Sequence, residues 1–199
     1  QTCALPICDG DRSCRVAVAE LGSFLAPHMS DPRRWPDARV WFERRAELGD
    51  ESERREALTA WARAEAGSFG DLGRATALAD RVVEEFPDDR EIRVLRAEWL
   101  LALGEVERGV EALLELRNES EGDERASFER RAAGLLLDLD KPRGAVRLLE
   151  DRLDADPMDG EALALALRAA ATPEAAEEAG ALVERVSEGL PPELRAQQL

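Results

Sequence analysis

The chain has 199 residues, of which 44% are hydrophobic and 35% are charged, so it holds enough apolar material to bury a continuous core and enough charge to stay in water. Its 27 basic and 43 acidic side chains give a net charge of −16, which repels nucleic-acid phosphates and anionic lipids and favours basic or neutral partners. The longest unbroken apolar run, Ala162–Leu167, is far shorter than the roughly 18 residues needed to cross a bilayer. We therefore expect no binding to nucleic acid and no insertion into a membrane.

Apolar stripes of helical length follow one another along the chain, separated by glycine and proline breaks. The first stripe covers Cys14–Leu25, and the proline-bearing loop Ala26–Pro36 ends it. Ten helices are expected, which form five pairs, and Pro191–Glu193 begins an eleventh. After the first, the predicted helices cover Asp37–Leu48, 52–68, Arg74–Phe86, 90–103, Val106–Leu116, Glu124–Leu139, Arg143–Leu153, Glu161–Ala171 and 173–188.

Three positions carry helix start signals. Ser52, followed four residues later by Glu56, is an approximate N-terminal signal for the helix over 52–68. Asp89 is expected to cap the helix that follows it, because a carboxylate there accepts orphan amide protons and opposes the positive helix end. Pro173 is expected at the first position of the last helix, where its missing amide hydrogen costs nothing.

A small residue recurs at nearly constant spacing along the chain, with intervals of 37, 34, 36 and 34 positions. This period is typical of a helical repeat array, in which the small residue lets two helices approach closely at their crossing. A larger side chain at Ala145 should therefore destabilise the fold more than one at Ala175, which lies outside the series. The series consists of Ala38, Ala75, Gly109, Ala145 and Ala179.

These residues resemble tetratricopeptide repeats over about residues 50–192. The shared features are a Gly-Asp or Gly-Glu between the helices, a small residue in the second helix and an Asp-Pro-type break about a dozen residues later. Ala97–Leu116 is the clearest unit. The resemblance implies an all-α fold, a right-handed α-solenoid of about five antiparallel helix pairs. The matching positions are Gly70, Ala75, Pro87, Gly104, Gly109, Asp140, Ala145, Pro157, Ala179 and Pro191.

The resemblance also implies a non-enzymatic scaffold that binds a peptide or a partner helix in a concave groove lined by the first helices. The alternative is a regulatory or spacer arm of a larger multidomain enzyme or signalling protein. The acidic excess is then expected on outer faces and loops. In the repeat register, the candidate groove residues are Ala57, Ala60, Ala64, Val94, Glu98, Leu101, Ser127, Arg130, Gly134, Glu161, Ala164 and Arg168.

One activity of the resembled family is not expected. Chaperone-binding tetratricopeptide proteins hold a C-terminal carboxylate with lysines and asparagines on the first helices. Here Lys141 is the only lysine and Asn118 the only asparagine, and both are predicted in connectors. A carboxylate clamp of that kind is therefore not predicted.

The sequence offers little for catalysis, metals or cofactors, and we expect none of the three. His28 is the only histidine, and Cys3, Cys8 and Cys14 match no zinc spacing. Two segments look like ligand loops: 67–73 is glycine-rich and 154–161 is acidic. The first lacks the strand and the Lys-Ser/Thr of a phosphate loop, and the second misplaces the glycine and closing glutamate of a calcium loop. Both are interpreted as interhelical turns, and the four tryptophans as packing residues rather than a ligand cage.

The start of the chain differs in kind from the rest. Gln1–Ile7 resembles the conceptual translation of a sequencing adaptor. We expect residues 1–8 to be a non-native or disordered leader and residues 9–199 to be one repeat array from a longer protein. Arginine outnumbers lysine 26 to one and tyrosine is absent, a usage typical of a GC-rich bacterial coding sequence. A cytoplasmic location is expected, with the periplasm as the alternative because we expect the true N-terminus to be missing.

Overall fold

The computed structural model describes residues 30–189, and within that range it contains nine α-helices, one short 3-10 helix and no strand. The all-α prediction is confirmed. The predictions for Cys14–Leu25, His28, the three cysteines and Pro191–Glu193 lie outside the described residues. The elements are η1 (Pro32–Arg34), α2 (Trp35–Leu48), α3 (Glu51–Ala66), α4 (Leu72–Glu85), α5 (Arg90–Ala102), α6 (Val106–Asn118), α7 (Gly122–Asp138), α8 (Pro142–Ala155), α9 (Gly160–Ala170) and α10 (Ala176–Gly189).

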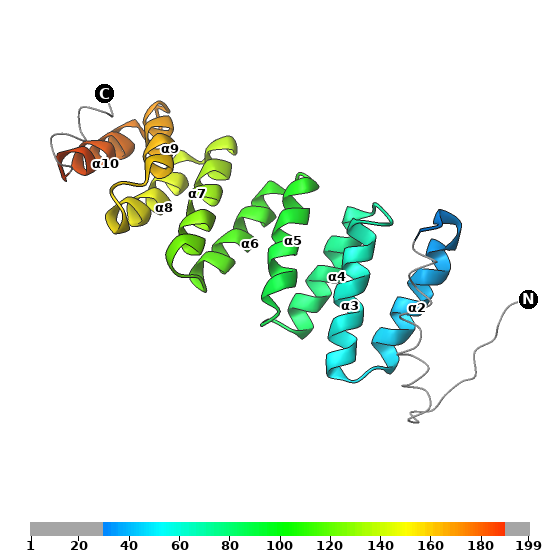
Figure 1. Cartoon of the computed structure of the whole chain (residues 1–199). Helices are drawn as coiled ribbons and strands as arrows, with labels where there is room; N and C mark the ends of the chain where they lie inside the picture. Colours follow the sequence, from blue (N-terminus) through cyan, green and yellow to red (C-terminus); the bar gives the residue numbers. More distant parts are fainter. Residues whose placement is uncertain (1–29, 190–199) are drawn as a thin grey trace, which may run out of the picture. The chain divides into compact units, whose positions relative to one another are not determined.

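The chain divides into two compact units, the first ending at Leu103 and the second beginning at Gly104. In the first unit α2 packs on α3, α3 on α4 and α4 on α5 (Figure 1). In the second unit each helix from α6 to α10 packs on the next one along the chain. The helices α5 and α6, which the sequence predicts as one pair, fall in different units.

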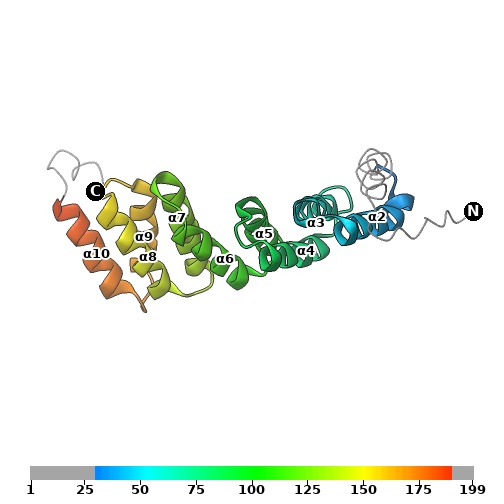
Figure 2. The same cartoon turned by 90° about the horizontal axis from the view of Figure 1, so that it is seen from below.

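In the second unit, helices that occupy the same position in successive pairs also contact one another. Helix α7 packs against α9, and α8 packs against α10, in addition to the contacts within each pair (Figure 2). This gives two layers, one of α7 and α9 and the other of α8 and α10. Such stacking of antiparallel helix pairs is the arrangement of an α-solenoid, and the predicted fold class is confirmed.

The recurring small residues all lie inside the fold. Ala38, Ala75, Ala145 and Ala179 are completely buried, and Gly109 is buried as well. They fall on α2, α4, α6, α8 and α10, so each marks the second helix of a predicted pair. The expectation that a small residue recurs at a buried position of each of these helices is therefore confirmed.

Enlarging one of these residues tests the crossing. Ala145→Leu is expected to lower the free energy of unfolding by about 1–3 kcal/mol, because the added side chain overpacks a filled core. The comparison with Ala175 was wrong: Ala175 is only 1% exposed and belongs to the same apolar cluster, so it is not a tolerant site. The exposed Ala176 at the start of α10 is the proper control. Urea unfolding followed by far-UV circular dichroism measures the stability of both variants. Equal midpoints for Ala145→Leu and Ala176→Leu would contradict the claim that Ala145 lies at a closely packed helix crossing.

The tryptophans of the first unit pack in its core, as predicted. Trp61 and Trp99 are buried. The ring of Trp61 stacks on Phe42 with the centroids 6.2 Å apart, and Trp35 contacts Phe69 at 5.2 Å. These aromatic contacts fix α2 against α3 and against the turn that follows α3.

Helix α3 begins with a different residue from the one predicted. Its N-cap is Asp50, whose carboxylate accepts a hydrogen bond from the amide of Glu53, while the Glu53 carboxylate accepts one from the amide of Asp50. This reciprocal capping box satisfies two orphan donors, and the start signal assigned to Ser52 and Glu56 was wrong. Asp89 does cap α5, accepting from the Ile92 amide at 3.3 Å, as predicted.

The assignment of this cap gives a stability prediction. Asp50→Ala is expected to lower the free energy of unfolding by about 1 kcal/mol, because the Glu53 amide loses its acceptor. Ser52→Ala should change it by less than about 0.5 kcal/mol, since Ser52 is exposed and makes no cap. Urea unfolding monitored by tryptophan fluorescence compares the two variants. A larger loss in Ser52→Ala would restore the original assignment.

The remaining helix ends lie within two residues of the predicted ones, except at α10. Pro173 lies in a turn, and α10 begins at Ala176. The turn is closed by the amide of Ala175, which donates to the carbonyl of Thr172 at 3.2 Å. The prediction that Pro173 opens this helix was wrong. In residues 30–189, no helix combines the length and apolar character needed to cross a bilayer.

Candidate functional site

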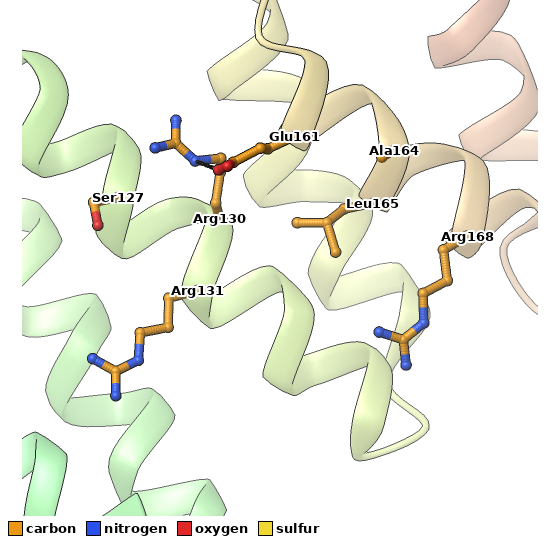
Figure 3. Close-up of a pocket in the computed structure, with 7 residues that line it drawn as sticks. All are labelled: Ser127, Arg130, Arg131, Glu161, Ala164, Leu165 and Arg168. Atoms are coloured by element: carbon orange, nitrogen blue, oxygen red, sulfur yellow. Dashed lines mark ion pairs between the residues drawn. The ribbon is translucent and has the colours of Figure 1, made fainter.

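An open pocket with a volume of about 590 Å³ lies between α7 and α9 in the second unit. Figure 3 shows side chains from both helices around it, with Leu165 extending from α9 toward α7. Ser127, Arg130 and Arg131 come from α7, and Glu161, Ala164, Leu165 and Arg168 come from α9. Residues three or four apart lie on one face of a helix, so each set forms one stripe.

The start of α9 fixes its stripe in place. Asp159 is the N-cap of this helix, and its Oδ1 atom accepts a hydrogen bond from the Ala162 amide at 3.0 Å. Across the pocket, Gly134 of α7 lies beside Leu165: a Cβ atom at Gly134 would be 3.8 Å from the Leu165 Cδ2 atom, an ordinary van der Waals contact. The apolar part of the lining, called the floor below, is made by Ala164 and Leu165.

One end of the pocket is rigid. The Nη1 atom of Arg130 donates to the Oδ2 atom of Asp159 at 2.7 Å, and the same oxygen accepts from Nε of Arg152 at 2.6 Å. The Asp159 side chain is only 5% exposed. Burial raises its pKa, but the hydrogen bonds from the Ala162 amide, Arg152 and Arg130 outweigh burial and lower the pKa overall. The hydrogen bond to Asp159 in turn raises the pKa of Arg130.

The other ion pairs at the pocket face solvent. The Nε atom of Arg130 lies 2.8 Å from the Oε2 atom of Glu161, whose side chain is 80% exposed (Figure 3). Arg168 pairs with Asp138 at 2.5 Å, and these side chains are 52% and 60% exposed. Exposed pairs of this kind contribute about 0–1 kcal/mol. Glu161 and Asp138 can therefore be replaced by another acceptor at little cost, whereas Asp159 cannot.

The structure brings together only part of the predicted groove. Ser127, Arg130, Glu161, Ala164 and Arg168 all line the pocket, and Gly134 borders it. The sequence analysis missed Arg131 and Leu165. Each lies four positions after a predicted groove residue, Ser127 or Glu161, so helical spacing alone could have found them.

In the first unit the predicted groove residues do not form such a site. Ala57 and Ala64 are buried in the core of this unit, so their assignment to a ligand-facing groove was wrong. Helix α3 packs against both α2 and α4, and these two alanines belong to the apolar cluster that the three helices share. Ala60 packs partly buried against the same core. On α5, Val94 and Leu101 are half-buried and Glu98 is exposed.

The two loop-like segments are interhelical turns. In 67–73, Phe69 is buried and Asp71 caps α4 by accepting from the Arg74 amide at 3.0 Å. Gly70 has a φ of 67°, which favours glycine because it has no Cβ atom. In 154–161, Asp156 and Asp159 accept hydrogen bonds from arginines. Both segments link consecutive helices.

A second pocket, of about 420 Å³, lies between α8 and α10. Arg185 lies 3.1 Å from Glu150 and 3.1 Å from Asp154, so its guanidinium links α10 to α8. Arg185 and Glu150 are among the residues that line this pocket. This pocket is smaller than the one between α7 and α9, and none of the residues predicted for the groove lines it. We therefore take the pocket between α7 and α9 as the candidate site.

Comparison with known proteins supports the fold and goes no further. No family model matches the chain, and no curated protein matches it. The solved structure of MamA MSR-1 C2 is similar, with a TM-score of 0.51 over 87% of this chain and 96% of that chain. The sequence identity is 17%, so the likeness shows the fold alone. The chain is thus similar to that protein in its helical architecture.

Proposed function

We propose that this chain is a non-enzymatic interaction scaffold that binds a peptide or a partner helix in the groove between α7 and α9. The observation that carries the proposal is the pocket itself. Five residues that the repeat register selects from two helices, about 30 positions apart in the sequence, line one open depression with an apolar floor. Stacked first helices are the surfaces that repeat proteins of this kind use for extended ligands.

The chemistry of the lining favours binding over catalysis. Three guanidinium groups, a hydroxyl and one carboxylate surround two apolar side chains. The carboxylate of Glu161 is paired with Arg130, and the Ser127 hydroxyl is exposed on α7. Such a set can hold polar groups at the rim and an apolar side chain on the floor, which suits a segment of another protein.

Filling the groove tests the proposal. A random dodecapeptide library displayed on phage would be selected against the full chain, and the enriched peptides would be measured with Ala164→Trp and Ala155→Trp. Both alanines are exposed, but only Ala164 lines the pocket. Ala164→Trp is expected to weaken binding by about tenfold or more, because the indole occupies the floor, whereas Ala155→Trp should leave it unchanged. Equal binding to both variants, or no enriched peptide, would contradict the proposal.

A further inference from the structure

We infer that the occupant of the groove between α7 and α9 is an acidic segment of a partner protein. Its carboxylates would take the places of Glu161 at Arg130 and of Asp138 at Arg168, and an apolar side chain between them would rest on Ala164 and Leu165. This inference builds on the proposed function, because it names the chemistry of the ligand at the same site.

The charge of the lining is opposite to that of the chain. The chain carries a net charge of −16, yet the pocket is lined by three arginines and a single glutamate. In Figure 3 the Arg130 side chain turns to Glu161, whereas Arg131 and Arg168 extend away from that pair. The expectation of basic or neutral partners, drawn from the net charge, therefore does not describe this pocket. Guanidinium groups supply donors, so the matching ligand supplies acceptors.

The burial of the counter-ions decides which of them a ligand can replace. Arg130 is held by two carboxylates, the nearly buried Asp159 and the exposed Glu161. Asp159 keeps the guanidinium in place, and Glu161 covers the edge that faces the pocket. A donor that is already oriented loses little freedom when a ligand carboxylate arrives. Arg168 pairs with the exposed Asp138, and that pair is equally open to exchange.

The apolar floor determines which kind of ligand side chain fits between the two ligand carboxylates. Ala164 is exposed, and Leu165 is half-buried beside Gly134. A ligand leucine or similar residue placed on this floor would remove apolar surface from water, which favours binding. A polyanion such as single-stranded DNA lacks such a group, finds no aromatic ring among the seven lining residues and meets the repulsion of the whole chain. The pocket thus suits a protein segment in which acidic and apolar residues alternate.

Three peptides of equal length, acetylated and amidated, test the inference by fluorescence anisotropy. One alternates leucine with glutamate, one leucine with glutamine and one leucine with lysine. The glutamate peptide is expected to bind at least about fivefold more tightly than either of the other two peptides. Amidation removes the terminal carboxylate, so the side chains alone decide the preference.

Two single substitutions are expected to shift the affinity for the glutamate peptide in opposite directions. Arg168→Gln is expected to weaken the glutamate peptide about three- to tenfold and leave the glutamine peptide unchanged, because an exchangeable donor is lost. Glu161→Gln is expected to strengthen the glutamate peptide about two- to fivefold, because Arg130 loses a competing carboxylate. Arg143→Gln is the matched control, since it removes the same charge from an exposed site on α8 outside the pocket. It should change binding less than about twofold.

The outcomes separate the two proposals. If the glutamine peptide binds as tightly as the glutamate peptide, and Ala164→Trp weakens both, the groove binds peptides and the acidic preference is wrong. If the lysine peptide or a single-stranded oligonucleotide binds more tightly than the glutamate peptide, or if Arg168→Gln matches Arg143→Gln, the inference is overturned. If no peptide responds to Ala164→Trp, the proposed function itself fails.

Discussion

Glu65→Gln is expected to lower the free energy of unfolding of the first unit by about 2–4 kcal/mol. Glu65 is completely buried, yet it is charged. Its carboxylate accepts from Nε and Nη2 of Arg39 at 2.8 and 2.6 Å and from the indole of Trp61 at 2.8 Å. A neutral amide of the same shape would leave Arg39 without its main counter-ion and place an amide nitrogen among donors.

Tryptophan fluorescence measures this effect in the right unit, because all four tryptophans lie between residues 35 and 99. Urea unfolding of Glu65→Gln would be compared with Glu56→Gln, a change on the same helix at a carboxylate that is 66% exposed and paired with Arg45. The control should change stability by less than about 0.5 kcal/mol. If Glu65→Gln is no worse than Glu56→Gln, this ion pair does not hold α2 on α3.

Asp159→Asn is the second substitution with a large expected effect, about 2–4 kcal/mol at pH 7. The Asp159 side chain accepts from Arg130, Arg152 and the Ala162 amide, and so joins α7, α8 and the start of α9. An amide in its place keeps part of the cap but removes the negative charge between two guanidinium groups. The rigid end of the groove should loosen together with the fold.

The effect should depend on pH in a defined direction. The pKa of Asp159 is lower in the folded chain than its ordinary value, because the hydrogen bonds from Ala162, Arg152 and Arg130 outweigh burial. The stability it contributes is therefore fully present above the unfolded-state pKa of about 3.9 and is lost as the pH falls through the folded-state value.

Urea unfolding by far-UV circular dichroism at pH 7 and at successively lower pH should show the gap between wild type and Asp159→Asn closing below about pH 4. Asp154→Asn is the control, because its side chain is 59% exposed and its partner Arg185 is exposed too. A gap that stays constant down to pH 2 would mean that the charge of Asp159 does not stabilise the fold.

Helices and their crossings could be predicted from the sequence because both depend on local periodicity. The small residues Ala75 and Ala145 lie on α4 and α8, one in each unit, and both are fully buried. The start of α3 was missed because Ser52 is a common cap residue, whereas the acid three positions after Asp50 is the stronger signal of a capping box. The turn before α10 depends on Thr172 and Ala175, which composition does not reveal.

The candidate site was only half predictable. On α7 and α9 the repeat register selected Ser127 and Ala164, which line the same pocket because these two helices pack against each other. On α3 the same register selected Ala57, which is buried, since burial depends on which helices cover a face. The pairing of Arg130 with Asp159 joins residues 29 positions apart, and net charge says nothing about such pairs.

The central claim is that acidic segments bind in the groove between α7 and α9. Amide hydrogen exchange of the full chain, with and without the leucine–glutamate peptide, tests it most directly, because it locates the binding site without any substitution. Protection is expected on α7 and α9, at the residues that line the groove, and not on α8 and α10, which line a different pocket. Slower exchange confined to Gly122–Asp138 and Gly160–Ala170 would agree with a scaffold that binds acidic segments there. Protection on α8 and α10, or in the first unit alone, would contradict it.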